Sequence, residues 1–321
     1  MGAGAHVVGV DIGGQTTKIG VVDARGEVLG QKVIRSDTYG TDSEAYLDAL
    51  AEAIKEVIMT AGVEGDVRGI GVGAPNGNYY SGTIAYAVNL AWAADSVIPF
   101  SEKLSSRVDG LPVILTNDAN AAAMGEMAYG AARGMKNFIM ITLGTGVGSG
   151  IVIGGNMVYG HDGFAGELGH TTAIRNNGRQ CNCGRTGCLE AYCSAIGVAR
   201  TAREWLESSS EPSVLREVDN ISSKSVYDAA KEGDALALRV FEYTGRLLGR
   251  QFAEFVAFSA PEAIILFGGL ARAKEFLYEP MLSAMNDNLL KIWQGKVKIL
   301  FSQLPESDAA ILGASALAWE A

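Results

Sequence analysis

Long apolar runs are missing from this 321-residue sequence. No segment approaches the roughly 18 consecutive apolar residues that a membrane-spanning helix needs. The start of the chain, MGAGAHVVGVDIGG, also lacks the charged, apolar and cleavage regions of a secretory signal peptide. We therefore expect a cytoplasmic protein with no membrane partner.

Basic residues are few as well. The sequence holds 26 Lys and Arg against 36 Asp and Glu, which gives a net charge of −10, and its basic residues form no cluster. A surface of this sign repels the phosphates of nucleic acids, so we expect no nucleic-acid partner. A composition with 48% apolar and 19% charged residues is typical of a folded protein, and the length suits two domains.

Cysteine is scarce and confined to one short segment. The four cysteines lie within thirteen residues of one another, whereas a disulfide framework would be spread along the chain. Ten residues separate His170 from the motif Cys181-x-Cys183-x₄-Cys188, and a structural zinc ion takes four nitrogen and sulfur ligands of this kind. We predict that these four residues bind zinc and order the loop 166–190; a set of buried or redox-active cysteines is the alternative. Cys193 is a fifth candidate for four places.

The chain repeats one pattern twice. The segments VGVDIGGQTTKIGVV and IMITLGTGVGSGIVI, about 130 residues apart, each read as a strand, a glycine turn and a strand. Two such hairpins suggest two related α/β domains that face each other across a cleft. We expect a small N-terminal domain of residues 1–116, joined by a C-terminal helix of about 305–321, and a larger domain of residues 117–304 that carries the zinc loop.

Apolar periodicity predicts the other elements. A helix over 42–60 has an apolar face, with Thr41 and Glu44 as a capping box at its start. Further helices are predicted over 236–258 and about 308–319. The predicted strands cover residues 6–12, 18–23, 27–34, 69–73, 113–115, 137–143, 150–153 and 263–267.

Three predicted strands end in glycine turns: Gly13-Gly14, Gly144-Thr145-Gly146 and Gly268-Gly269. Glycine allows the positive φ with which successive backbone N–H groups converge on an anion, so these turns are candidate phosphate sites. Ordinary hairpins are the alternative. Thr16, Thr17, Thr145 and Lys18 supply further donors. The sequence contains neither a P-loop nor the dinucleotide motif before a helix, which favours a mononucleotide.

A helix is predicted to follow the strand 113–115 in the segment TNDANAAAMGE. Asp and Asn are favoured before a first helical turn, so Asp118 is expected to start and cap this helix. Its place at the end of a strand of an α/β sheet also suits a catalytic carboxylate. On these residues alone both interpretations stay open.

The motifs VDIGGQTTKIG, NDANAAAMGE, LGTGVGSG, GELGH and CNCGRTGCLE occur in this order. With them the chain, from about residue 7 to residue 319, resembles the ROK family of bacterial sugar kinases and repressors. The resemblance implies a two-domain α/β fold of the actin-like ATPase (ribonuclease-H-like) type, with ATP in the inter-domain cleft and a sugar beneath its γ-phosphate. It also implies a homodimer or homotetramer. Because it leaves Cys193 out of the zinc site, we expect that residue to pack in the core.

The resemblance implies a role for single residues too. Asp118 matches the general base that takes the proton of a sugar hydroxyl. The implied sugar-binding residues are Asn76, Asn89, Asn117, Asp118, Glu167, His170 and Glu190. The implied ATP-binding residues are Asp11, Gly13, Gly14, Gln15, Thr16, Lys18, Gly144, Thr145, Gly146, Gly268 and Gly269. Mg²⁺, which the phosphates and water hold for the most part, is the expected cofactor beside ATP and structural Zn²⁺.

Some of these roles have plain structural alternatives. Asp11 would hold a water of the Mg²⁺ ion or be a buried structural acid. Glu167 and Glu190 would otherwise be a helix-start acid and a solvated surface charge.

Two positions depart from the family pattern. Gln15 stands where D-I-G-G-T has threonine, and Asn76 stands where G-x-P-G ends in glycine. An amide can still donate to phosphate, so the first departure is a tolerated variant. Asn76 brings a side chain to a place where backbone alone usually approaches the sugar, so the second departure bears on substrate choice.

We predict ATP-dependent phosphorylation of a hexose at its 6-hydroxyl. Glucose is the expected substrate, because Glu190 favours a gluco-configured aldose in similar enzymes. N-acetylglucosamine, N-acetylmannosamine, fructose and allose are alternatives within the family. A sugar-responsive repressor and a catalytically inactive sensor are the non-enzyme alternatives. A repressor would carry a helix-turn-helix domain before the first glycine turn, where this sequence has ten residues before Asp11, and a sensor would not require Asp118.

Overall fold

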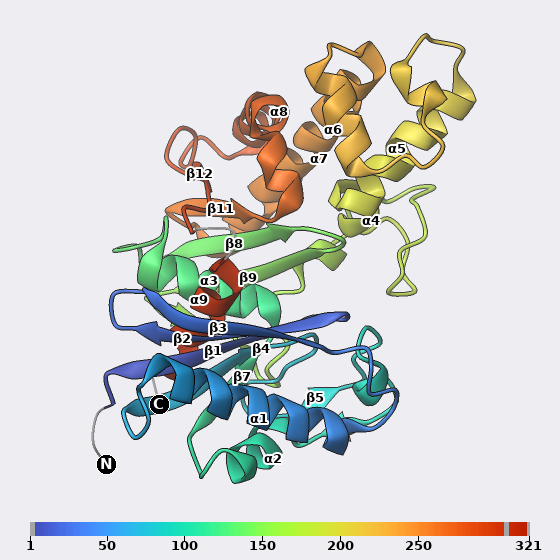
Figure 1. Ribbon diagram of the computed structural model, residues 1–321. Coiled ribbons are helices and arrows are strands. Elements are labelled where there is room, and N and C mark those ends of the chain that lie inside the picture. Colours follow the sequence, from blue (N-terminus) through green and yellow to red (C-terminus); the bar gives the residue numbers. More distant parts are fainter. Residues whose placement is uncertain (1–3, 305–307, 320–321) are drawn as a thin grey trace. The chain divides into compact units, whose positions relative to one another are not determined.

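The structure is a computed structural model that describes residues 4–304 and 308–319 (Figure 1). The chain folds into two compact units. The first comprises Met1–Met135, Met157–Gly166 and Ser302–Ala321, and the second comprises Lys136–Asn156 and Glu167–Phe301. Residues 305–307 and 320–321 of the expected C-terminal helix lie outside the described residues. The domain boundaries expected at residues 116 and 304 stay a prediction.

A five-stranded sheet forms the centre of the first unit. Its strands are His6–Ile12 (β1), Thr16–Asp23 (β2), Val28–Arg35 (β3), Val67–Gly73 (β4) and Val113–Thr116 (β7). They lie in the order β3-β2-β1-β4-β7. β1 is antiparallel to β2 and parallel to β4, and β4 is parallel to β7. The carboxyl ends of β1, β4 and β7 therefore meet at one edge of the sheet. A separate antiparallel pair joins Ile84–Ala85 (β5) to Val97–Ile98 (β6).

Helices α1 (Ser43–Ala61) and α2 (Phe100–Arg107) cover one face of this sheet (Figure 1). The apolar face predicted for α1 is buried in the same core as alternate residues of β1 and β2. The residues that the two strands contribute are Val8, Val10, Ile12, Ile19 and Val21. Apolar side chains at every second strand position thus pack against the apolar face of α1 in one layer.

The predicted capping box at the start of α1 is wrong by one residue. Asp42 rather than Thr41 is the N-cap, and its carboxylate accepts the N–H of Ala45 at 3.0 Å. Glu44 does not reach back to the cap, because its carboxylate pairs with Lys103 and Arg107 of α2. Thr41 and Asp42 are both good cap formers, and the pairing of Glu44 with α2 is not visible in the local sequence.

The small-residue helix α9 (Ala309–Ala318) packs on the opposite face of the sheet. A Cβ atom added to Gly9 would lie 2.1 Å from the carbonyl oxygen of Ile311, and one added to Gly71 would lie 1.9 Å from that of Ala314. Helix α3 (Asp118–Tyr129) reaches α9 equally closely, because a Cβ on Gly125 would lie 2.7 Å from the Cα of Gly313. Glycine in these strands and helices is required by direct backbone contact.

The second unit repeats the sheet of the first. Its strands are Phe138–Leu143 (β8), Val147–Ile153 (β9), Asn156–Met157 (β10), Ala263–Phe267 (β11) and Lys298–Phe301 (β12). They lie in the order β10-β9-β8-β11-β12, with β8 antiparallel to β9 and parallel to β11, and β11 parallel to β12. The strand order and the directions of these three pairings match those of β3-β2-β1-β4-β7, so the repeat inferred from the two glycine hairpins is confirmed.

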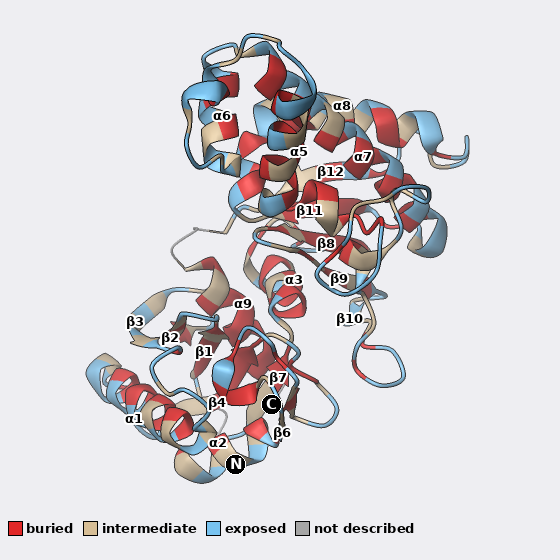
Figure 2. Ribbon diagram, turned by 90° about the vertical axis from the view of Figure 1, so that its right-hand side faces the viewer, coloured by how far each residue is buried: buried red, intermediate tan, exposed pale blue. Residues whose placement is uncertain are grey.

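Five helices belong to this unit: Glu190–Cys193 (α4), Ala195–Ser208 (α5), Ser223–Lys231 (α6), Ala235–Ser259 (α7) and Lys274–Asn288 (α8). The long helix α7 is buried along much of its length, as the red segments in Figure 2 show. It packs on α8 closely enough that a Cβ on Gly249 would lie 2.2 Å from the carbonyl oxygen of Met281. Among the described residues, no helix combines the length and the apolar character needed to cross a membrane.

Candidate active site

The carboxyl edge of the first sheet gathers several of the predicted site residues. Asp11 lies at the end of β1, Asn76 follows β4, and Asn117 and Asp118 follow β7. Because these three strands are parallel, the residues that follow them meet at the same edge, where α/β sheets bind their ligands.

Asn117, and not Asp118, caps helix α3. The Asn117 side chain accepts the N–H of Asn120 at 2.7 Å. Asp118 is the first residue of the helix, as expected, and its carboxylate accepts only the adjacent N–H of Ala119, at 2.9 Å. The expectation that Asp118 caps the helix is therefore wrong. Its carboxylate remains exposed to solvent instead of being used for capping.

The pKa values of the two acids at this edge are both raised. Burial is the main cause that raises the pKa of Asp11 to about 6; the negative charge of Asp118 adds to it, and Lys18 opposes it. The pKa of Asp118 is also raised, mainly because the surrounding protein reduces the hydration of its carboxylate. A carboxylate with a raised pKa is a better proton acceptor near neutral pH.

Asn76 and Asn89 flank one loop of the first unit. Asn76 has a φ of 53°, which asparagine tolerates better than most residues, and its amide nitrogen donates to the carbonyl oxygens of Ala85 and Tyr86 at 3.0 and 3.1 Å. Asn89 is exposed, and its carbonyl oxygen would lie 2.9 Å from a Cβ added to Gly14. The loop thus connects the turn after β4 with the glycine turn between β1 and β2.

The explanation offered for the turn glycines is wrong for most of them. Among the turn glycines singled out in the sequence, only Gly268 has a positive φ, of 103°. Gly14 is required by the close approach of Asn89, and Gly146 by the carboxylate of Glu190, which would lie 2.5 Å from an added Cβ. Gly144 has open space in that direction. Close packing, rather than backbone conformation, thus accounts for Gly14 and Gly146.

The threonines of the first turn divide between two faces. The hydroxyl of Thr17 is buried and pairs with Tyr46 at 2.7 Å and Ser36 at 2.9 Å, so the expectation that it donates to a phosphate is wrong. Thr16 points to the other face of the strand and is partly exposed. Gln15 at the turn itself is exposed.

Two predicted turns of the second unit follow adjacent strands. Gly144-Thr145-Gly146 follows β8 and Gly268-Gly269 follows β11, and β8 and β11 are parallel neighbours. A Cβ on Gly268 would lie 2.5 Å from the carbonyl oxygen of Leu143 at the end of β8. The chain after Gly268 forms a 3₁₀ segment, Gly269–Ala273, that leads into α8.

The four predicted zinc ligands lie together. One ligand atom from each of His170, Cys181, Cys183 and Cys188 lies within 4.8 Å of the others. Nδ1 of His170 is 3.8 Å from Sγ of Cys181, and Sγ of Cys183 is 3.7 Å from Sγ of Cys188. Ligand pairs around a tetrahedral zinc ion lie about 3.6–3.8 Å apart, so this donor set fits Zn²⁺. Cys193 is fully buried in the core cluster, as expected.

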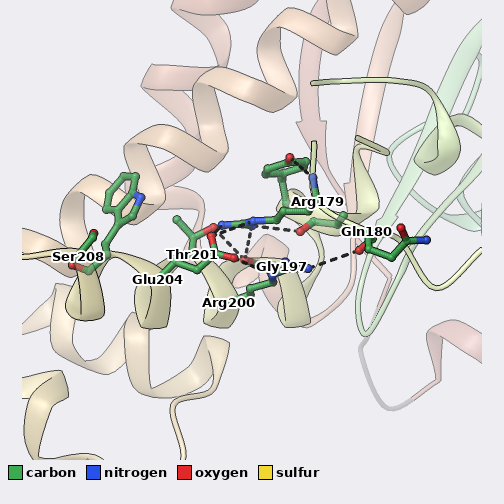
Figure 3. Close-up of polar contacts among 10 residues, drawn as sticks. Arg179, Gln180, Gly197, Arg200, Thr201, Glu204 and Ser208 are labelled. Atoms are coloured by element: carbon green, nitrogen blue, oxygen red, sulfur yellow. Dashed lines mark hydrogen bonds and ion pairs between the residues drawn. The ribbon is translucent and has the colours of Figure 1, made fainter. Parts of the chain in front are cut away.

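An arginine that the sequence analysis did not single out anchors the metal loop. The guanidinium of Arg179 donates to Glu204 of α5 and to the carbonyl oxygens of Ala191 and Gly197, and it lies 4.5 Å from the ring centroid of Tyr192 (Figure 3). These partners are up to 25 positions away in the chain, so no local sequence motif predicts the contacts. The ion pair is mostly shielded from water on the arginine side, where 9% of the side chain is exposed.

Glu190 lies between the metal loop and the glycine turn. Its Oε2 accepts the N–H of Val147 at 2.9 Å, and its Oε1 is 3.7 Å from Sγ of Cys181. A small cavity of about 70 Å³ lies beside it, lined among others by Thr145, Asn182 and Arg200. Glu167 is exposed and precedes the 3₁₀ turn Leu168–His170 that presents the histidine.

Comparison with known proteins identifies relatives along the whole chain. The model of the ROK family matches residues 7–321. A glucokinase of Halalkalibacterium halodurans is 40% identical over 280 residues, which cover 85% of this chain and 83% of that protein. A glucokinase of Thermotoga maritima is 34% identical over 316 residues, covering 97% and 96%. The crystal structure of a ROK family glucokinase from Streptomyces griseus in complex with glucose and AMPPNP has a TM-score of 0.79 at 33% identity, covering 98% of this chain and all of that one.

Proposed function

The chain belongs to the ROK family and has the actin-like ATPase fold of its sugar kinases, and on that premise we propose that it transfers the γ-phosphoryl group of ATP to the 6-hydroxyl of glucose. The observation that carries this proposal is the match to a glucokinase that binds glucose together with an ATP analogue, over 98% of this chain. Two further glucokinases match most of the chain at 34–40% identity.

Asp118 is the proposed general base. Its carboxylate is solvent-accessible at the start of α3 and its pKa is raised by the surrounding protein. In the reaction the 6-hydroxyl oxygen forms a bond to the γ-phosphorus, the bond to the β–γ bridging oxygen breaks, and ADP leaves. Asp118 takes the hydroxyl proton as the new bond forms, which supplies on the order of 10²–10⁴ of the rate.

The sugar hydroxyls are assigned to a set of polar side chains. Asn117 keeps its amide nitrogen free for a donor role, because only its oxygen caps α3. Glu190 accepts from a hydroxyl through Oε1, since Oε2 is engaged by Val147. Asn89, Glu167 and His170 complete the proposed set, and Asn76 contributes its oxygen only, because its amide nitrogen is bound to two backbone carbonyls.

The phosphates are assigned to the glycine turns. The proposed nucleotide-binding residues of the first unit are Asp11, Gly13, Gly14, Gln15, Thr16 and Lys18. Those of the second unit are Gly144, Thr145, Gly146, Gly268 and Gly269. Mg²⁺ would neutralise part of the triphosphate charge, and Asp11 would hold one of its water ligands. Zn²⁺, held by the Cys₃His set, would keep the loop that bears His170 in place and leave no coordination position open for substrate.

The assembly and the partners belong to the same proposal. A homodimer or homotetramer is expected from the family resemblance, and light scattering coupled to size-exclusion chromatography would measure it. The net charge of −10 supports the absence of a nucleic-acid partner.

The proposal is tested by ADP release with glucose, fructose, N-acetylglucosamine and N-acetylmannosamine as acceptors. We expect the highest kcat/KM with glucose. Asp118→Asn should lose about 10²–10⁴ in kcat while glucose affinity stays within about tenfold, because a base acts mainly in the transition state. Asp219→Asn, which alters an exposed acid of the second unit, is the control and should keep full activity. Turnover retained in Asp118→Asn would contradict the role of Asp118, and absence of ADP release with every sugar would contradict the activity.

A further inference from the structure

One short segment holds the Gly144–Gly146 turn from both ends. The N–H of Ala195, the first residue of α5, donates to the carbonyl oxygen of Gly144 at 2.8 Å. The N–H of Val147 donates to Oε2 of Glu190 at 2.9 Å. Glu190 and Ala195 lie only five positions apart, so one short segment, which directly follows the proposed zinc ligand Cys188, makes both hydrogen bonds to the turn.

The contact with Glu190 explains why residue 146 is glycine. An added Cβ would lie 2.5 Å from Oε2 of Glu190, and Gly146 does not have a positive φ. A methyl group there would have to push the end of the Glu190 side chain away from the N–H of Val147, so glycine keeps this hydrogen bond intact. Gly144, in the same turn, offers a matched comparison, because an added Cβ there would have no atom within 4 Å and its φ is not positive either.

The same carboxylate also contacts the metal loop. Its Oε1 is 3.7 Å from Sγ of Cys181, and Glu190 follows Cys188 by two positions. The two oxygens thus have separate surroundings: Oε2 faces the backbone of the turn, and Oε1 faces the cluster of proposed zinc ligands. Displacing the carboxylate would disturb both the backbone of the turn and the cluster of proposed zinc ligands.

We propose that Glu190 is a positioning residue that fixes the Gly144–Gly146 turn relative to the metal-binding loop, in addition to its contact with the sugar. This inference rests on the proposed function, in which the turn receives the phosphates of ATP and the loop receives the sugar. One carboxylate then ties the two substrate sites of the second unit together: a hydroxyl bound at Oε1 and the turn bound at Oε2 constrain each other's position. Loss of Glu190 should therefore weaken ATP binding as well as sugar binding.

A double-mutant cycle read by thermal unfolding tests the link without using activity. Gly146→Ala should lower Tm by about 2–10 °C, because the methyl group displaces the Glu190 carboxylate from the N–H of Val147. In the Glu190→Ala background the same substitution should cost less than half as much, because the carboxylate is gone. Gly144→Ala should change Tm by about 1 °C or less in both backgrounds. An equal cost of Gly146→Ala with and without Glu190 would overturn the proposal.

Kinetics separate positioning from a general loss of structure. In Glu190→Gln the side-chain oxygen can still accept the N–H of Val147, so KM for ATP should stay within about threefold while KM for glucose rises. Glu190→Ala should raise KM for ATP by about tenfold or more, the usual cost of losing a hydrogen bond to a charged group. A fall in kcat with unchanged KM for ATP in Glu190→Ala would contradict the proposal. Absence of kinase activity together with a coupled Tm cycle would refute the proposed function and leave the structural link standing.

Discussion

The carboxyl group of Asp11 is expected to destabilise the fold at neutral pH. Burial and the charge of Asp118 raise the pKa of Asp11 from 3.8 to about 6. A pKa that is higher in the folded state than in the unfolded state means that the folded protein holds the proton more tightly. The resulting stabilisation is full below pH 3.8 and is lost as the pH rises through about 6. Asp11→Asn should therefore be more stable than the wild type at pH 7.5 and similar to it near pH 4.

The size of the effect follows from the shift. A difference of about 2 pKa units corresponds to at most about 3 kcal/mol between low and neutral pH. Because the side chain is partly open to solvent, we expect about 1–2 kcal/mol, which would raise Tm by about 2–8 °C at pH 7.5. Calorimetric scans of both proteins at several pH values between 4 and 7.5, without nucleotide or Mg²⁺, would measure the difference.

An acid with the opposite shift serves as the control. The backbone N–H groups of Lys136 and Asn137 lower the pKa of Glu262, so its stabilisation is present at neutral pH and is lost as the pH falls. Glu262→Gln should thus be less stable than the wild type at pH 7.5, and the two should converge in acid. A difference between Asp11→Asn and the wild type that stays constant from pH 4 to 7.5 would refute the reasoning on Asp11.

Two further predictions concern packing and the metal. Gly71→Ala should destabilise the protein by about 1–3 kcal/mol or more in calorimetry, because its Cβ would lie 1.9 Å from the carbonyl oxygen of Ala314. Gly30→Ala is the control: its Cβ would lie 3.6 Å from its nearest neighbour, so it should change stability by less than about 1 kcal/mol. Equal destabilisation by the two substitutions would contradict the packing argument. Cys188→Ser should lose zinc, measured by mass spectrometry of the metal, and should bind glucose more than about tenfold more weakly. Cys193→Ala is the control and should retain the zinc. Loss of the metal from Cys193→Ala would show that the proposed ligand set is wrong.

Sequence periodicity predicted the sheets well because each signal is local. The strands β1, β8 and β11 are apolar runs that end at glycine turns; β1 and β8 are the central strands of the two sheets, and β11 lies beside β8. The zinc ligands were equally visible, because three of the four lie within eight residues of each other and their spacing limits what else they can do.

Local patterns failed where a neighbour far along the chain decided the outcome. Both helix caps were misplaced by one residue, since Asp42 stands beside Thr41 and Asn117 beside Asp118, and either member of each pair is a good cap. The reason for glycine at position 146 depends on Glu190, 44 positions later, which spacing alone does not reveal. The burial of Thr17 could have been predicted, because it shares a strand face with Ile19 and Val21.

The two sheets also show how a repeated framework supports different chemistry at matching positions. In each hairpin, the residue before the last of the first strand is polar: Asp11 in β1, paired with Lys18, and Thr142 in β8, paired with Gly148. The negative charge of Asp11 destabilises the fold at neutral pH, as its raised pKa indicates. The hydroxyl of Thr142 instead accepts the N–H of Gly148 at 3.1 Å and carries no charge. The same framework position thus carries a charge in one sheet and a neutral hydrogen-bonded hydroxyl in the other, so the two turns offer an anionic ligand different electrostatic surroundings.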